Sequence, residues 1–157
     1  MDQAAYNMYM RIALDLAREA AAEGEVPVGA LVIDKDGQII GTGANRREAD
    51  QDPIAHAEIL AIASAANRIG FWRLEDTTLF VTLEPCPMCA GAILNARIPR
   101  VVFGALDPKA GAVQSLYTLL DDERLNHRCE VEGGVLAEEC SEILSSFFRN
   151  LRMQGKK

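Results

Sequence analysis

The stretch that decides the fold covers residues 77–89 and reads Thr-Thr-Leu-Phe-Val-Thr-Leu-Glu-Pro-Cys-Pro-Met-Cys. Its first seven residues form an apolar, β-branched run that predicts a buried strand. Pro85 then opens a helix that places Cys86 and Cys89 three residues apart on one face and ends before Ile98. Residues 100–104 predict another strand. A strand, a crossover helix and a strand imply a parallel pair with functional residues at the carboxyl ends of the strands.

A second helix is predicted upstream, over residues 54–68, which are rich in Ala, Ile and Leu. Asp52 is expected to cap this helix and Pro53 to occupy its first position, where no amide donor is needed. His56 and Glu58 would then lie in the first turn. Both helix starts are expected at the same edge of the sheet.

One imidazole and two thiolates, from His56, Cys86 and Cys89, make a ligand set that suits zinc. Three protein ligands leave a fourth position open, which is typical of a catalytic site and not of a structural one. Glu58 is placed to handle protons if its helix points end-on at the metal. A non-catalytic zinc-binding module is the alternative, but such a module has no use for a free carboxylate.

The remaining elements complete one domain over residues 1–157. We expect a helix over 4–23, a hairpin of strands 28–33 and 38–42, a polar loop at 45–51, a loop at 107–111, a short helix at 116–120, an edge strand within 129–135 and a terminal helix over 137–153. The predicted fold class is α/β: a three-layer α/β/α sandwich with a five-stranded mixed sheet.

Composition indicates a soluble globular protein, with 49% apolar and 25% charged residues in 157. No apolar run suits a signal peptide or a membrane span. We therefore expect four reduced cysteines and a cytoplasmic protein without a membrane partner. Cys129 and Cys140 are interpreted as buried thiols, and a second metal pair with His127 is the less favoured alternative.

The pairing of His-x-Glu with Pro-Cys-x-x-Cys is the signature of the zinc-dependent cytidine deaminase superfamily. Within it, the chain resembles the bacterial tRNA-specific adenosine deaminases from about residue 8 to residue 152. The segments that carry this resemblance are residues 25–30, 55–58, 81–86, 88–91, 100–104, 126–128 and 147–149.

The resemblance implies a cytidine deaminase-like fold and hydrolytic deamination of adenosine to inosine at the wobble position of tRNA, chiefly arginine tRNA with an ACG anticodon. It implies one zinc ion per chain on His56, Cys86 and Cys89, a zinc-activated water, and Glu58 as the catalytic proton shuttle. The implied partners are the tRNA anticodon stem-loop and a second copy of the chain in a homodimer.

Substrate contacts follow from the same resemblance. Asn45 matches the residue that hydrogen-bonds the extruded nucleotide, although it can also simply cap a turn. The other matching positions are Asp107 and Lys109 near the flanking nucleotides, and Asn126, Phe148, Arg149 and Arg152 on the surface that holds the anticodon loop. Each has a plainer alternative: Asp107 as a turn former, the two arginines as solvated residues, and one of Phe147 and Phe148 as core.

The net charge of −7 is unusual for a protein that binds nucleic acid. The last nine residues nevertheless carry four positive charges and no acidic one, which predicts a basic strip on the terminal helix. The rival function is a deaminase of small substrates: guanine, cytidine or a pyrimidine intermediate of riboflavin synthesis. The Phe-Phe-Arg tail and the extent of the resemblance disfavour that rival.

Overall fold

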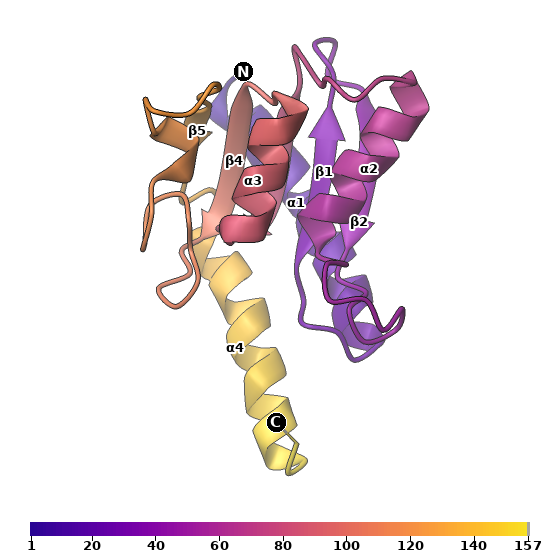
Figure 1. Ribbon diagram of the computed structural model, residues 1–157. Coiled ribbons are helices and arrows are strands. Elements are labelled where there is room, and N and C mark those ends of the chain that lie inside the picture. The colour runs from indigo at the N-terminus through magenta and orange to yellow at the C-terminus, as the bar shows by residue number, and fades with distance from the viewer. Residues whose placement is uncertain (157) are drawn as a thin grey trace.

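Five strands form one mixed sheet in the order β2-β1-β3-β4-β5 (Figure 1). The computed structural model describes residues 1–156. Strand β1 pairs antiparallel with both β2 and β3, whereas β3, β4 and β5 run parallel. Strands β2, β3 and β4 therefore end at the same edge of the sheet. The bounds are β1 Gly29–Ile33, β2 Ile39–Ala44, β3 Thr78–Leu83, β4 Arg100–Ala105 and β5 Glu130–Glu132.

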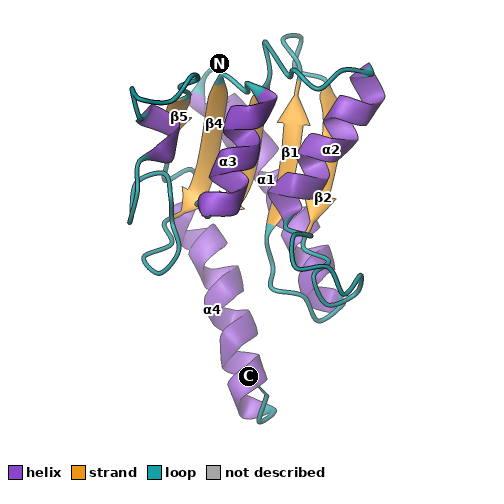
Figure 2. Cartoon of the chain, in the orientation of Figure 1, coloured by secondary structure: helices purple, strands orange, loops and turns teal. Residues whose placement is uncertain are grey.

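Helices cover both faces of the sheet (Figure 2). Helices α2 (Ala57–Ile69) and α3 (Pro87–Ala96) pack on one face, and α1 (Gln3–Ala22) and α4 (Ala137–Met153) lie on the other. A short 3₁₀ helix, η1 (Leu119–Asp121), lies between β4 and β5. No helix among residues 1–156 is long and apolar enough to cross a membrane.

Strand β3 supplies side chains to two separate cores because neighbouring residues of a strand point to opposite faces. Leu79 and Val81 pack with residues of α2 and α3, whereas Phe80 packs with α1. The ring of Phe80 lies 5.0 Å from that of Tyr9, centroid to centroid. Each of these fully buried side chains contributes about 1.5–3 kcal/mol by removal from water.

Helix α2 lies unusually close to β2. A Cβ atom on Gly43 would lie 2.2 Å from the carbonyl oxygen of Ala57, and one on Gly41 would lie 2.4 Å from that of Ala61. Two glycines in the strand and a stripe of alanines in the helix therefore let the two backbones touch. This contact sets the first turn of α2 directly beside the carboxyl end of β2.

Helix α4 extends beyond the carboxyl edge of the sheet (Figure 1), where Asn150 and Leu151 of its last turns line a pocket together with Arg18 and Ala21 of α1. Cys140, near its start, is its one fully buried residue. The exposed end presents Phe148, whose side chain is 41% exposed. An aromatic ring this exposed is available to a partner below the sheet edge.

The three-layer α/β/α sandwich with a five-stranded mixed sheet is confirmed. Most element bounds agree with the predictions to within two residues, and three elements depart further. Helix α2 begins at Ala57 and not at Pro53, because Asp52 Oδ1 accepts a hydrogen bond from the Ile54 amide and closes a separate turn. The short helix lies at 119–121 instead of 116–120. The last strand spans only 130–132 and stops at the Gly133-Gly134 pair that was expected to interrupt it, although the amides of Gly134 and Val135 still donate to carbonyls of β4.

Candidate active site

The candidate site lies at the carboxyl edge of the sheet, where α2 and α3 begin. His56 is the N-cap residue of α2, and Cys86 is the N-cap residue of α3. Cys89 is buried in the first turn of α3. The predicted convergence of the two helix starts is confirmed. Because α2 begins at Ala57, later than predicted, His56 lies at the N-terminus of the helix and not within its first turn.

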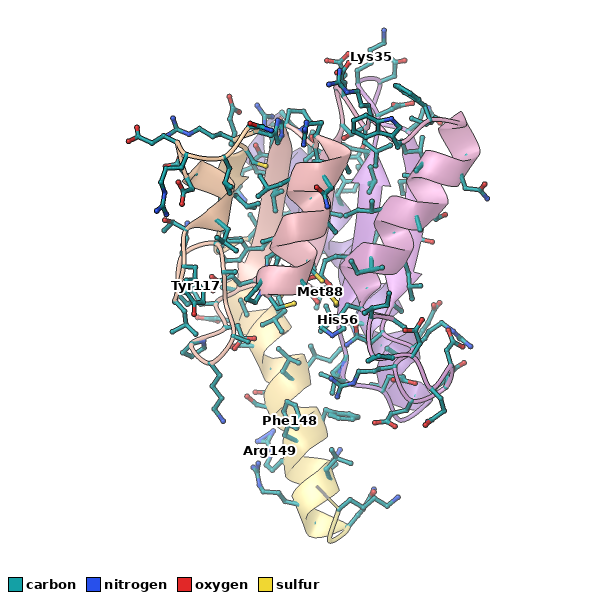
Figure 3. All side chains as sticks on the ribbon, in the orientation of Figure 1. Lys35, His56, Met88, Tyr117, Phe148 and Arg149 are labelled. Atoms are coloured by element: carbon teal, nitrogen blue, oxygen red, sulfur yellow. The ribbon has the colours of Figure 1, made fainter. Side chains whose placement is uncertain are left out.

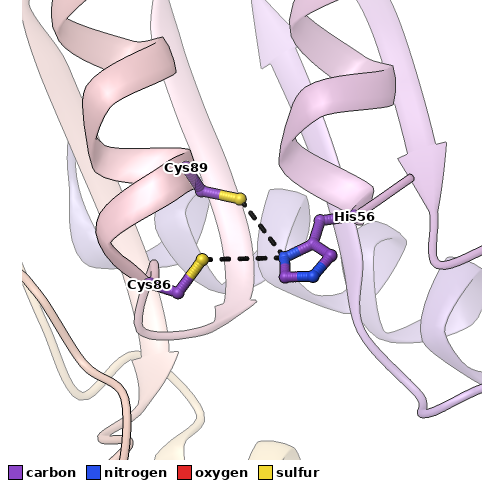
Figure 4. A group of neighbouring side chains, drawn as sticks. All are labelled: His56, Cys86 and Cys89. Atoms are coloured by element: carbon purple, nitrogen blue, oxygen red, sulfur yellow. Dashed lines mark hydrogen bonds between the residues drawn. The ribbon is translucent and has the colours of Figure 1, made fainter. Parts of the chain in front are cut away.

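The three side chains form a compact group suited to zinc (Figure 4). His56 Nδ1 lies 3.7 Å from Cys86 Sγ and 3.5 Å from Cys89 Sγ. In a tetrahedral zinc site, bond lengths of about 2.3 Å to sulfur and about 2.0–2.1 Å to nitrogen place these atoms about 3.6 Å apart. The ligand atoms therefore already have the spacing that a tetrahedral metal site requires.

Electrostatics favour the thiolate form of one of the two cysteines, Cys86. A hydrogen bond from the Cys89 thiol and a further one involving His56 outweigh burial and lower the pKa of Cys86 to about 4. The same bond to Cys86, together with burial, raises the pKa of Cys89. Hydrogen bonding with Cys86 also raises the pKa of the His56 imidazole. Binding of a metal by both thiols requires Cys89 to give up its proton as well.

Glu58 lies beside this group, in the first turn of α2. Its side chain is 4% exposed, and burial raises its pKa to about 7. A carboxyl group so placed can hold a proton or give one up at the floor of the cavity. Because α2 points end-on at the site, Glu58 and His56 both reach it although they are only two residues apart.

Asn45 ties the start of α2 to the loop before β1. Its Oδ1 accepts a hydrogen bond from the Ala57 amide at 2.9 Å, and its Nδ2 donates to the Val26 carbonyl at 2.9 Å. His56, the N-cap residue, provides no side-chain cap, so Asn45 caps the helix from outside. Asn45 also lines the cavity, and one N–H of its amide has no part in these two bonds.

A cavity of about 680 Å³ opens above His56 and Glu58. The loops at 45–48 and 107–110 and the helix α4 border it. Its lining includes Val26, Val28, Asn45, Arg47, His56, Glu58, Cys86, Asp107, Ala110, Phe147, Phe148, Leu151 and Lys156. Such a volume accommodates a nucleobase with its sugar.

The residues proposed to contact substrate divide into two groups. Asn45, Asp107 and Phe148 line the cavity with the metal-binding group, and Phe147 joins them while staying half-buried. Phe148 and Arg149 project from different sides of α4, with Phe148 on the side below His56 (Figure 3).

The other four do not line the cavity. Lys109, Asn126 and Arg152 are exposed outside it. Arg149 is exposed as well and donates to Glu142 at 3.1 Å. Any contact they make would therefore involve parts of the substrate that extend beyond the cavity.

Several charged residues of the cavity were not singled out from the sequence, among them Glu25, Arg47 and Glu84. Glu25 is 2% exposed and accepts hydrogen bonds from the amides of Glu48 and Ala49, which fixes the loop at 45–52. Arg47, in that loop, lies close enough to His56 for its charge to oppose, without reversing, the rise in the pKa of His56 that the hydrogen bond with Cys86 causes. Glu84 is also buried. The sequence offered one indication for Glu84, namely a charged residue between a predicted apolar strand and the helix that carries Cys86 and Cys89. It offered no indication that Glu25 or Arg47 would line the cavity.

The second metal site is not formed. His127 Nε2 and Cys129 Sγ both hydrogen-bond the carbonyl oxygen of Ile98, at 2.7 and 3.1 Å. Cys140 belongs to the core on the opposite face of the sheet from Cys129. The interpretation of these cysteines as buried thiols is confirmed, with burial raising the pKa of each to about 12.

A mixed sheet with a His/Cys/Cys group and a buried glutamate at its carboxyl edge defines a deaminase of the cytidine deaminase-like class, and residues 4–152 match the MafB19-like deaminase family. The tRNA-specific adenosine deaminase of Bacillus subtilis (strain 168) is 52% identical over 149 residues, covering 95% of this chain and 92% of the relative. That of Haemophilus influenzae is 54% identical over 147 residues, covering 94% and 85%.

A solved structure from work on A-to-I editing by tRNA:A34 deaminases superposes with a TM-score of 0.84 at 43% identity. It covers 87% of this chain and 99% of the solved one. The chain belongs to the family of tRNA-specific adenosine deaminases.

Proposed function

We propose that this protein hydrolyses adenosine to inosine at the wobble position of a tRNA anticodon, chiefly in arginine tRNA with an ACG anticodon. The observation that carries the proposal is a buried Glu58 beside a zinc-type His/Cys/Cys group, at the floor of a cavity bordered by an exposed aromatic helix. The relatives named tRNA-specific adenosine deaminase support the substrate class.

His56, Cys86 and Cys89 would hold one zinc ion per chain. A zinc ion bound there supplies the activation of water that attack on a purine ring requires at neutral pH. The spacing of the three ligand atoms fits this ion, as does the soft character of two thiolates and an imidazole.

Glu58 is assigned to proton transfer. It takes a proton from the attacking water, delivers it to the purine ring as the new C–O bond forms at carbon 6, and helps to protonate the amine that leaves. The balance is adenosine plus water giving inosine plus ammonia. Its burial at the cavity floor keeps bulk water from replacing it in these transfers.

Asn45, Asp107 and Phe148 are proposed to seat the nucleotides. Asn45 lines the cavity, and the amide N–H that its two hydrogen bonds leave unused suits a purine or ribose acceptor. The exposed ring of Phe148 suits stacking on an unpaired base of the loop. Lys109, Asn126, Arg149 and Arg152 lie farther out and would contact the rest of the anticodon stem-loop.

The direct test is incubation of the protein with an anticodon stem-loop that contains ACG, followed by sequencing for inosine. Conversion of the wobble adenosine by the wild type and not by Glu58→Ala supports the proposal. Turnover of free guanine or cytidine with no change in the RNA would instead identify a small-substrate deaminase.

Homodimer assembly and a cytoplasmic location stay predictions from the family resemblance. Light scattering after size-exclusion chromatography measures the first, and twice the mass of the 17.1 kDa chain is the expected result.

A further inference from the structure

The carboxylate of Glu84 is buried without a cationic partner among residues 1–156. Glu84 connects β3 to α3 and is 2% exposed. Its Oε1 accepts hydrogen bonds from the Asp107 amide at 3.0 Å and the Ser115 hydroxyl at 2.5 Å. Its Oε2 accepts from the amides of Val113, Gln114 and Ser115 at 3.1, 2.7 and 2.9 Å. One side chain thus binds both ends of a nine-residue loop, 107–115.

The loop closes over the carboxylate at a glycine. A Cβ atom on Gly111 would lie 2.3–2.4 Å from the carboxyl group of Glu84, so any larger residue would displace one of the two. The amide of Ala112 also donates to the carbonyl of Pro85 at 2.8 Å, which ties the loop to the start of α3. The conformation of the loop and the position of the Glu84 carboxylate therefore depend on each other.

This loop is a wall of the catalytic cavity. Asp107 and Ala110 line the cavity together with Glu84 itself. One carboxylate oxygen of Asp107 also takes part in the loop's internal bonding, because its Oδ1 accepts from the amides of Lys109 and Ala110. The shape of the wall is thus determined by internal hydrogen bonds that converge on one buried charge.

We infer that Glu84 is a positioning residue: it holds the loop 107–115 as a preformed wall against which the RNA strand beside the reacting adenosine is seated. The inference rests on the proposed function for the identity of the substrate. It assigns Glu84 to the binding of the RNA and not to the chemistry. A loop already ordered in the free protein saves the cost of ordering it upon binding, which lowers the KM.

The test is Glu84→Gln, which keeps the size of the side chain but replaces one acceptor oxygen by an amide that faces N–H donors. Deamination of the ACG stem-loop should show a KM about tenfold higher, with kcat within about threefold and zinc content unchanged. Gly111→Ala, which keeps the charge and displaces the loop, should change the KM in the same direction. Glu132→Gln, on an exposed residue of β5, is the control and should change neither.

Amide hydrogen exchange gives a second readout that needs no activity. Exchange of the amides of residues 113–115 should be about tenfold faster in Glu84→Gln. The matched control is Glu25→Gln, at another buried carboxylate that accepts backbone amides: it should accelerate exchange at residues 48–49 and leave 113–115 as in the wild type. Equal exchange at 113–115 in Glu84→Gln and wild type would overturn the inference.

Loss of zinc with a parallel fall in kcat would also overturn it, because Glu84 would then support the neighbouring metal ligands instead of the loop. If the wild type does not deaminate the RNA, the proposed function fails, while the exchange measurement still decides the role of Glu84 in the loop.

Discussion

The side chain of Asn45 accepts a hydrogen bond from the amide of Ala57, the first residue of α2. Asn45 lies at the end of β2 and Ala57 directly follows His56, so this single bond links the sheet to the helix that carries His56 and Glu58. The position of both functional residues thus depends on a residue that the sequence suggested mainly as a substrate contact.

Asn45 should therefore show two separable effects. Asn45→Ala should lower the free energy of unfolding by about 0.5–2 kcal/mol, the usual loss for a helix cap, and should also reduce kcat/KM. Asn45→Asp keeps the acceptor for Ala57 but loses the amide donors, so it should retain more of the stability and still lose activity. Urea unfolding and steady-state kinetics measure the two effects. Equal activity of Asn45→Asp and wild type would exclude a donor role toward substrate.

Metal analysis of the purified protein should find one zinc per chain, held by three protein ligands. Cys86→Ala should abolish stoichiometric zinc and lower the melting temperature, because the metal joins the starts of α2 and α3. Each 1 kcal/mol of lost stability corresponds to about 2–4 °C for a chain of this size. Cys129→Ala is the matched control and should keep its zinc. Two zinc ions per chain, or none after gentle purification, would contradict the assignment.

Glu58→Gln should keep zinc and fold but lose turnover by at least about 10²–10⁴-fold, since a general acid–base role contributes that range and Glu58 acts in more than one step. The substitution preserves side-chain volume, so packing at the cavity floor is retained. Single-turnover assays on the anticodon stem-loop measure the loss. Activity within tenfold of the wild type would remove Glu58 from the mechanism.

The basic end of α4 should contribute to RNA binding through Arg152 more than through Arg149. Arg149 is paired with Glu142, whereas Arg152 is exposed in the last turn. Arg152→Ala should weaken binding and lower the log–log salt slope by about 0.7–0.9, the value of one phosphate contact. Arg149→Ala should have a smaller effect on binding, because Glu142 already neutralises part of the charge of Arg149. In a protein that carries Glu142→Ala, Arg149 is released from this pair, and Arg149→Ala should then weaken binding as much as Arg152→Ala does.

Deletion of residues 149–157 should extend this effect, and metal content should survive it because the zinc ligands lie elsewhere. The deletion also removes Lys157, which falls outside the described residues. Substitution of Lys157 alone would measure its own contribution to RNA binding. Leu151 lines the cavity, and its loss can loosen α4. Thermal unfolding therefore accompanies the binding assay. A folded truncated protein that edits at the full-length rate in physiological salt would remove the tail from recognition.

The sequence predicted those parts of the fold in which local pattern and tertiary packing agree. Helix α4 was predicted with its observed bounds because its amphipathic pattern follows a Gly-Gly pair that ends the preceding segment. The start of α2 was missed because Asp52 and Pro53 suit a turn as well as a helix start, and the competing Asp52–Ile54 hydrogen bond decides between them.

The candidate site was predictable where the spacing of residues along the chain indicates their role, as the Cys-x-x-Cys spacing does for Cys86 and Cys89. Residues whose role depends on long-range hydrogen bonds were not. Glu84 contacts amides 23 to 31 residues away, and Glu25 contacts amides 23 and 24 residues away. Nothing in their neighbouring residues specifies those partners. Arg47 likewise becomes a cavity residue only because Glu25 fixes the loop that carries it.

Because of the backbone contact between β2 and α2, the geometry of the site does not depend on the packing that determines much of the protein's stability. Gly41 and Gly43 lie directly against the helix, so no deformable side chain stands between the sheet and the residues that begin with His56. A substitution in the opposite core, such as Leu14→Ala in α1, removes buried volume and lowers the melting temperature. It leaves the spacing of His56 and Glu58 intact, since that spacing is fixed by main-chain atoms. Variants can therefore become thermally weak while each remaining folded molecule keeps full catalytic competence.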